Sequence, residues 1–254
     1  RQRAGLKWQA AGRRARGPYA EKIQDEFMQL RAEGNGEEAT RIDQRNALLL
    51  PLIKGYGSEK AYELLSVALQ IFGGSGYVTD YPMEQYIRDQ KIDSLYEGTT
   101  HIQALDLFFR KIARDGGATL LALMEEIKAT AREAESGGAL ADEGKALLAA
   151  LEDVQGIIGA LMGKIQESIY HGGLQVNHVL FALSETVIAW LLVEHAALAI
   201  EKGAAANGTE KAYYEGKVAS ARFFCKNVLP YISATRKIVE ASTLDLMELD
   251  EAAF

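Results

Sequence analysis

A single carboxylate, Glu97, lies in a short break between two helical patterns, flanked by Gly98, Thr99 and Thr100. A Gly-rich turn at residues 73–76 precedes it by about 20 residues. General-base catalysis needs a proton acceptor held close to the proton that it removes, and a carboxylate at a helix junction beside a tight turn suits that role next to a bound cofactor. The residues alone leave a second interpretation open, a surface acid in a loop, because carboxylates are mostly exposed.

The turn itself reads Gly73-Gly74-Ser75-Gly76. It follows a helical pattern, whereas a P-loop or a dinucleotide fingerprint needs a strand before the glycines and a helix after them. The turn therefore predicts either a helix stop or a set of backbone amides that face a phosphate or a flavin. Gln70, one helical turn earlier, could add a side-chain amide to such a site.

Other polar residues carry weaker signals. The spacing of the histidines is not that of a metal triad, so we expect no metal site; they are His101, His171, His178 and His195. Arg88-Asp89 predicts a local ion pair or a contact in helix packing.

Helical periodicity recurs along the chain and strand signals are nearly absent. Apolar residues spaced three and four apart predict a helix over 58–72 with one buried stripe: Ala61, Tyr62, Leu65, Ala68, Leu69 and Phe72. Pro82 favours the start of a second helix that Gly98 ends. Thr100 and Gln103 match a capping box that opens a third helix through Ile112.

The composition shifts toward Ala, Leu and Glu after Gly116-Gly117. We expect helices at about 118–136, 139–170, 174–202, 209–228 and 231–249, separated by Gly-containing breaks. Such a run is typical of an antiparallel bundle. The predicted fold class is therefore all-α.

Composition limits the classes of protein to which this chain can belong. The chain has 254 residues, 48% of them hydrophobic, enough for one large domain or two small ones. Its net charge of -7 disfavours a nucleic-acid binder. The only cysteine, Cys225, excludes an intrachain disulfide and fits a reducing compartment, so we expect a cytoplasmic location.

Two further expectations concern segments. The apolar run at 187–200 is interrupted by Glu194 and His195, and we predict no transmembrane helix. The first sixteen residues hold six Arg and Lys and no acid, which predicts a solvated arm or a start inside a longer product, with a targeting remnant as the alternative.

Four motifs, taken in order, resemble the C-terminal helical domain of the acyl-CoA dehydrogenases. They are Gln70-Ile71-Phe72-Gly73-Gly74-x-Gly76-Tyr77, Tyr81-Pro82-x-Glu84, Arg88-Asp89 and Tyr96-Glu97-Gly98-Thr99. The resemblance divides the chain into a poorly matched segment, 1–43, a matched region, 44–115, and a further helical domain, 116–254, like that of the larger bacterial members. It implies a partial family bundle followed by a second antiparallel helical bundle.

In that family Glu97 corresponds to the base that removes the α-proton of an acyl-CoA thioester, in fatty-acid β-oxidation chemistry, while FAD accepts the β-hydride. The resemblance places Tyr96 and Gly98 at the thioester. It places Gln70, Gly73 and Gly74 at the FAD pyrophosphate of a neighbouring subunit, and Thr99 near the adenosine portion of the cofactor. It also implies a homodimer or higher homo-oligomer and an electron-transfer flavoprotein or similar acceptor.

The family's N-terminal helical domain and middle β-domain have no counterpart in these 254 residues. We therefore expect a C-terminal fragment that is inactive alone. The alternative is a non-catalytic helical module for oligomerisation or interaction, derived from the same family.

Overall fold

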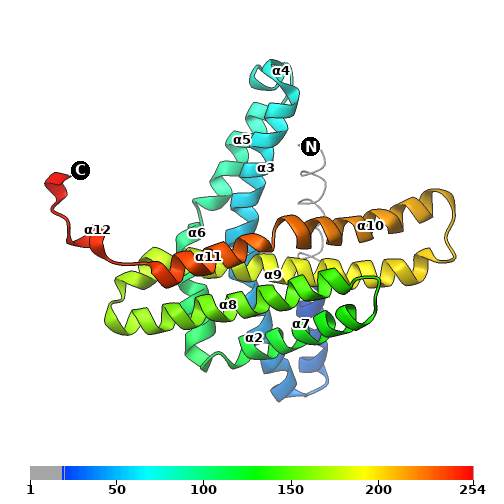
Figure 1. The fold of residues 1–254 in the computed structure, drawn as a ribbon, viewed down its shortest axis with the longest axis horizontal. Coiled ribbons are helices and arrows are strands. Elements are labelled where there is room, and N and C mark those ends of the chain that lie inside the picture. Colours follow the sequence, from blue (N-terminus) through cyan, green and yellow to red (C-terminus); the bar gives the residue numbers. More distant parts are fainter. Residues whose placement is uncertain (1–18, 20, 254) are drawn as a thin grey trace.

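The computed structural model describes residue 19 and residues 21–253, and every regular element in that range is helical. The prediction of an all-α fold is confirmed. Residues 21–32 are helical and precede the labelled elements of Figure 1. These are α2 (Gly36–Pro51), the π-helix η1 (Leu52–Tyr56), α3 (Gly57–Phe72), the one-turn α4 (Gly74–Tyr77), α5 (Met83–Lys91), η2 (Ile92–Ser94), α6 (Thr100–Leu105), the π-helix η3 (Asp106–Ile112), η4 (Ala113–Asp115), α7 (Ala118–Ser136), α8 (Ala141–Glu167), α9 (Tyr170–Gly203), α10 (Gly208–Asn227), α11 (Pro230–Ala241), α12 (Asp245–Glu248) and η5 (Glu251–Ala253).

Helix α9 forms the centre of the molecule. It packs against α6, α7, α8, α10, α11 and η1 (Figure 1). From Thr186 to Val193 every side chain is buried, on all sides of the helix, and Trp190 is 1% exposed. A helix that is apolar all round is stable only where other helices surround it, which explains its place in the core.

Two helices, α8 and α9, are long and apolar enough to cross a membrane when length and composition alone are considered. In α9, 78% of the apolar window is buried against the rest of the chain, and in α8 39% is buried. The apolar composition of α9 is thus accounted for by helix packing. The absence of a transmembrane segment stays a prediction.

Small residues set the spacing of the helices around α8. A Cβ on Gly144 would lie 2.5 Å from the backbone oxygen of Ala131 and 2.5 Å from the backbone nitrogen of Glu135, so only glycine lets α8 approach α7 this closely. The side chain of Arg236 lies across Gly156, where an added Cβ would come within 2.4 Å of its Nε. The contact at Gly144 requires a bare backbone because its neighbours are main-chain atoms, whereas a Cβ at Gly156 would displace the Arg236 side chain.

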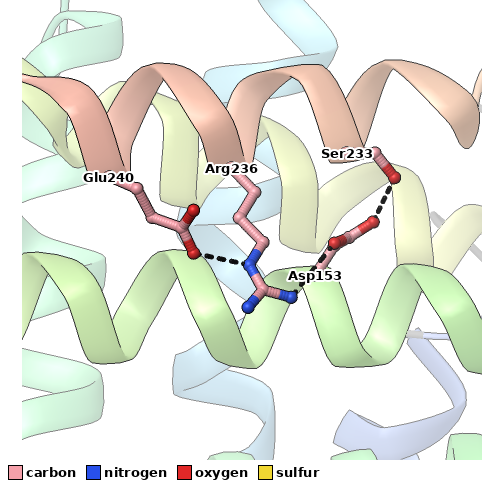
Figure 2. Close-up of polar contacts among 4 residues, drawn as sticks. All are labelled: Asp153, Ser233, Arg236 and Glu240. Atoms are coloured by element: carbon pink, nitrogen blue, oxygen red, sulfur yellow. Dashed lines mark hydrogen bonds and ion pairs between the residues drawn. The ribbon is translucent and has the colours of Figure 1, made fainter.

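Polar contacts join α11 to α8 (Figure 2). Arg236 Nη1 lies 3.3 Å from Asp153 Oδ1, while Arg236 Nε lies 2.7 Å from Glu240 Oε1. Ser233 donates a hydrogen bond from Oγ to the other oxygen of Asp153. The side chains meet where they are partly shielded from water, so they define how α11 sits on α8.

The α3–α5 hairpin projects from the bundle, with α4 at its tip (Figure 1). The predicted buried stripe on α3 is therefore wrong beyond its first turns. Ala61 is 2% exposed, but the rest of the stripe is only partly buried and Phe72 is 44% exposed. Periodicity identified the helix and its apolar face, but the distal half of that face packs only on α5 and α4.

The predicted end of the last long helix also differs from the structure. Helix α11 ends at Ala241, because Ser242 is extended (ψ 138°), and a separate turn, α12, follows. Lys164 Nζ donates to the carbonyl of Ser242 at 2.6 Å and holds this end against α8. The predicted continuous helix over 231–249 is thus wrong in its last turns, where no partner helix covers the chain.

One cluster of buried apolar side chains runs through the described residues, from Ile23 to Val239. It includes Leu48 and Leu52 from the family-like region and Leu180 and Val187 from the further helices. The two regions share a core, because α9 packs on both. The boundaries at residues 43 and 115 stay predictions about the sequence.

Candidate active site

The segment that contains Glu97 joins η2 to α6 at the base of the hairpin. Glu97 has φ 55° and is the only non-glycine residue with positive φ in the described part of the chain; Gly98 follows with φ 91°. The left-handed region is unfavourable for side chains with a Cβ, and such strain is found most often at functional sites. The two residues turn the chain from η2 into α6.

Gln103 holds this turn from the next helix. Its Nε2 donates to the carbonyl oxygen of Glu97 at 3.2 Å. A Cβ on Gly98 would lie 2.7 Å from the same nitrogen, so glycine at 98 keeps the path for this hydrogen bond open. The conformation of Glu97 therefore depends on both Gly98 and Gln103.

Thr99 is the N-cap of α6. Its hydroxyl accepts from the backbone N–H of Ile102 at 3.4 Å. The predicted capping box of Thr100 with Gln103 is wrong, because the N-cap lies one residue earlier. Gln103 turns toward Glu97, and Thr100 Oγ1 donates to Glu59 Oε1 at 2.5 Å. Thr99 thus supplies an acceptor to an N–H group in the first turn of α6 that would otherwise lack a partner within the helix.

The same segment is attached to η1. Lys54 Nζ donates to the carbonyl oxygen of Asp93, and lies 4.8 Å from the centroid of the Tyr96 ring. A cation over an aromatic face contributes about 0.5–1 kcal/mol at an exposed site. Lys54, Glu59 and Gln103 thus hold the ends of the segment, which gives Glu97 a rigid support.

The carboxylate of Glu97 is exposed and takes part in no hydrogen bond or ion pair with the described residues. It is therefore available to a molecule bound beside it. Tyr96 is 50% exposed and Gly98 is partly exposed, so all three present an open surface. A carboxylate that acted as a general base here would need other groups to cover this surface and exclude water.

Gln70, Gly73 and Gly74 lie at the opposite end of the hairpin, where α3 meets α4 (Figure 1). Gly73 has φ 61° and ψ -145°, a region open to glycine but not to other residues. No atom lies within 4 Å of a Cβ built on Gly73 or Gly74, and Gln70 is exposed. Another molecule can therefore approach the main chain closely here.

The structure does not bring these two sets of residues together within one chain. Helix α3 has 16 residues, and at about 1.5 Å of rise per residue it separates them by roughly 24 Å. Gln70, Gly73 and Gly74 form the tip; Tyr96, Glu97, Gly98 and Thr99 form the base.

The remaining predicted polar residues have other environments. His101 Nδ1 lies 3.2 Å from Asn177 Oδ1 on α9, and no group of three or more His, Cys, Asp or Glu gathers among the described residues. Arg88 and Asp89 are exposed, and neither takes part in an ion pair within the described range. The predicted local ion pair at Arg88-Asp89 is thus wrong.

Sequence reasoning missed Lys54 and Glu59 as supports of the site, because they lie about 40 residues earlier in the chain. Gln103 was predicted to form a capping box with Thr100, whereas in the structure its side chain contacts Glu97. Its position a few residues after Gly98, at the start of a helix, is the one local signal that pointed to it.

Two family models match the chain over these helices. One, described as "Acyl-CoA dehydrogenase, C-terminal domain", matches residues 31–110, which include the whole hairpin and the Glu97 segment. The other, described as "Acetyl-CoA dehydrogenase C-terminal like", matches residues 123–250, about half of the chain. The chain belongs to the acyl-CoA dehydrogenase family. The predicted resemblance is confirmed, and the first match begins at residue 31, inside the segment that appeared poorly matched from sequence.

Curated acyl-CoA dehydrogenases are similar over most of this chain. Identity is 47% over 227 residues with the broad-specificity linear acyl-CoA dehydrogenase FadE5 of Mycobacterium tuberculosis, a match that covers 87% of this chain and 37% of that protein. Identity is 36% over 212 residues with the 3-methylmercaptopropionyl-CoA dehydrogenase of Ruegeria pomeroyi, a match that covers 80% of this chain and 34% of that protein. The chain thus spans little more than a third of the length of these acyl-CoA dehydrogenases.

Solved acyl-CoA dehydrogenases share the fold. The enzyme from Bacillus anthracis, complexed with FAD, has a TM-score of 0.73 at 19% identity, over 99% of this chain and 42% of that one. ACDH-11 of Caenorhabditis elegans, in complex with C11-CoA, has a TM-score of 0.68 at 20% identity, over 98% of this chain and 40% of that one. At this identity the likeness establishes the helical arrangement alone.

Proposed function

We propose that this chain is the C-terminal helical part of a FAD-dependent acyl-CoA dehydrogenase, and that Glu97 is the base that removes the α-proton of the acyl-CoA thioester. The observation that carries the proposal is the free carboxylate of Glu97 on a strained backbone within Tyr96-Glu97-Gly98-Thr99. Strain of this kind persists only where surrounding contacts enforce it, and here Gln103 and Lys54 supply them.

Each residue of the segment has a task in this proposal. Glu97 accepts the α-proton, which requires its carboxylate to be ionised and close to the Cα of the acyl group. Tyr96 and Gly98 border the thioester. Gln103 fixes the direction of the Glu97 backbone, so that the carboxylate does not need to be ordered again in every turnover.

The tip of the hairpin fits a phosphate-bearing cofactor. Gly73 and Gly74 leave the space beside the main chain empty, and Gln70 contributes an exposed amide. When bound, FAD would accept the hydride from the β-carbon of the acyl group. Because the tip lies far from Glu97 in one chain, we propose that it holds the pyrophosphate of the flavin in a neighbouring subunit, and that Thr99 lies near the adenosine part.

The substrate class in this proposal is an acyl-CoA thioester, in keeping with the names of the similar dehydrogenases. Catalysis requires the N-terminal and β-domains of the family to cover the Glu97 surface. A homodimer or higher homo-oligomer and an electron-transfer flavoprotein or similar acceptor complete the proposal.

The decisive experiment replaces Glu97 in the complete enzyme and follows flavin reduction by an acyl-CoA in a stopped-flow instrument. We expect Glu97→Gln to lose about 3–5 kcal/mol of transition-state stabilisation, the range for a general base, while flavin content stays at one per subunit. Asp43→Asn, an exposed acid on α2, is the matched control and should reduce at the wild-type rate. A near-normal rate for Glu97→Gln would remove this residue from the mechanism.

A second candidate function is a non-catalytic module for oligomerisation. The observation in its favour is the set of exposed apolar side chains on the hairpin and after it: Phe72, Tyr77, Tyr81, Tyr86, Ile92 and Leu95. Exposed apolar patches mark contacts with other proteins. A purified protein that forms oligomers but never shows the visible absorption of a bound flavin would favour this function over the first.

A further inference from the structure

A polar cleft lies away from Glu97, where the hairpin base meets the later helices. Its volume is about 620 Å³, within the range of small-molecule sites. Helices α3, α9, α10 and α11 and the π-helix η1 all contribute to its walls. The residues proposed for the acyl-CoA reaction do not line it.

Glu185 on α9 is the main charged group of the cleft. It is mostly buried, and its Oε1 accepts one long hydrogen bond, 3.3 Å from the Tyr56 hydroxyl. No cationic nitrogen of the described residues lies within 4.0 Å of its carboxylate. Lys60 attracts this carboxylate from a greater distance, but Lys60 is itself paired with Glu63. A buried carboxylate without a close counter-ion is costly, and a bound cation would lower that cost.

The other charges of the cleft cancel. Lys60 Nζ forms an ion pair with Glu63 Oε2 at 2.7 Å, and both come from α3. Burial lowers the pKa of His178 on α9, so its ring is neutral at pH 7. Among the lining residues α10 contributes no charged group, and α11 contributes only the Tyr231 hydroxyl as a titratable group. The ionised cleft therefore has one net negative charge, on Glu185.

Two polar side chains that line the cleft, one on α10 and one on α11, can accept hydrogen bonds. Asn227 uses its Nδ2 to donate to the carbonyl of Phe223 at 2.9 Å, which leaves its Oδ1 to accept. Thr235 donates from Oγ1 to the carbonyl of Tyr231 at 3.0 Å, which leaves the lone pairs of its oxygen. Together with Glu185 they favour a ligand that donates hydrogen bonds.

Aromatic rings form the apolar part of the walls. Tyr56 and Phe181 pack edge to face with their centroids 5.5 Å apart, and Phe224 and Tyr231 also line the cleft. Lys60 Nζ already lies 5.8 Å from the centroid of the Tyr56 ring. Aromatic faces attract cations, and their surfaces also accept an alkyl chain.

We propose that this cleft binds a small organic cation, an alkylammonium group paired with Glu185, with its apolar part against the aromatic rings. The ammonium donates to Glu185, and the acceptors on α10 and α11 take its remaining hydrogens. The proposal stands apart from flavin chemistry, since no residue of the Glu97 segment lines the cleft.

Three probes of equal chain length separate charge from apolar contact: n-butylammonium, n-butanol and n-butyrate. We expect n-butylammonium to bind the purified protein, measured by chemical-shift changes in a spectrum with ¹³C-labelled glutamate carboxyls, while the neutral and anionic probes do not bind. Burial raises the pKa of Glu185 to about 7. The affinity at pH 8 should therefore exceed that at pH 6 by about tenfold, because the ionised fraction rises by that factor.

Glu185→Gln should abolish binding, while Glu194→Gln, on the same helix but outside the cleft, should bind as the wild type does. Equal binding of n-butanol, an affinity that does not change with pH, or wild-type affinity in a folded Glu185→Gln protein would each overturn the proposal. The pH series uses the wild-type protein, so it decides the matter even if Glu185→Gln does not fold.

Discussion

The side chain of Gln103 donates to the backbone carbonyl of Glu97 at 3.2 Å, and Glu97 is the one non-glycine residue with positive φ in the described part of the chain. The hydrogen bond and the strained backbone occur together at the residue that we propose as the catalytic base. A base on a strained but fixed backbone is positioned before substrate arrives, which reduces the entropy lost in the reaction.

The first prediction concerns that strain. Glu97→Gly should be more stable than Glu97→Ala by about 1 kcal/mol in free energy of unfolding, because alanine keeps the left-handed strain and glycine removes it. Urea denaturation of both variants measures the difference. The same two substitutions at Gln85, exposed in α5, should give the opposite order, since there glycine is the poorer helix former. A lower stability of Glu97→Gly than of Glu97→Ala would mean that the backbone is not strained in solution.

A second prediction tests the role of Gln103. Gln103→Met keeps the length of the side chain but has no donor, so the carbonyl of Glu97 loses its partner. We expect a loss of about 0.5–1.5 kcal/mol in the free energy of unfolding. In the complete enzyme we expect a fall in the rate of flavin reduction with little change in KM, because the acyl-CoA contacts remain. An unchanged rate at reduced stability would assign Gln103 a structural role only.

The contact between α7 and α8 provides a third prediction. Gly144→Ala should destabilise the protein by about 1–3 kcal/mol, because its Cβ would overlap backbone atoms of α7 that cannot move aside. Gly159→Ala, in the same helix, is the matched control: a Cβ there meets no atom within 4 Å, and we expect a gain of about 1 kcal/mol from helix propensity. Thermal unfolding followed by circular dichroism measures both, and two changes of the same sign would contradict the packing described above.

A fourth prediction follows from the burial of Glu185, which raises its pKa from 4.5 to about 7. The folded protein then holds this proton more tightly than the unfolded chain does. The resulting stability is complete below pH 4.5 and is lost as the pH rises through about 7. Glu185→Gln cannot ionise, so its stability relative to the wild type should rise by about 2–3 kcal/mol between pH 4.5 and pH 8.

Melting temperatures of wild type and Glu185→Gln across that pH range measure the effect. Glu201→Gln, at the exposed end of α9, is the control and should follow the wild type at each pH. Parallel curves for wild type and Glu185→Gln would show that Glu185 is solvated in the folded protein.

Local signals in the sequence predicted most helices and the place of Glu97 between two of them. Helix periods and Gly breaks are properties of neighbouring residues, so α3, α7 and α10 begin and end within a residue or two of the predicted positions. The four motifs are also local patterns, and their order along the chain is enough to indicate the family.

Long-range contacts decided the rest. The stripe on α3 has the pattern of a core face, but only tertiary structure shows that its distal half projects from the bundle. Thr99 caps α6 in place of Thr100 because Thr100 contacts Glu59, a residue in another helix. Capping and burial depend on what lies opposite a residue, which the local pattern does not contain.

The sequence by itself determined that Glu97 lies in a turn between helices, because Gly98 and the helical patterns on either side are adjacent in the chain. Only the tertiary structure decided that Lys54 and Gln103 hold that turn and that the Gly73 tip lies at the other end of the hairpin. It also decided that Glu185 faces a cleft built from five elements. The physical reason is that hydrogen bonds, burial and charge pairing act through space, between residues that the order of the chain keeps apart.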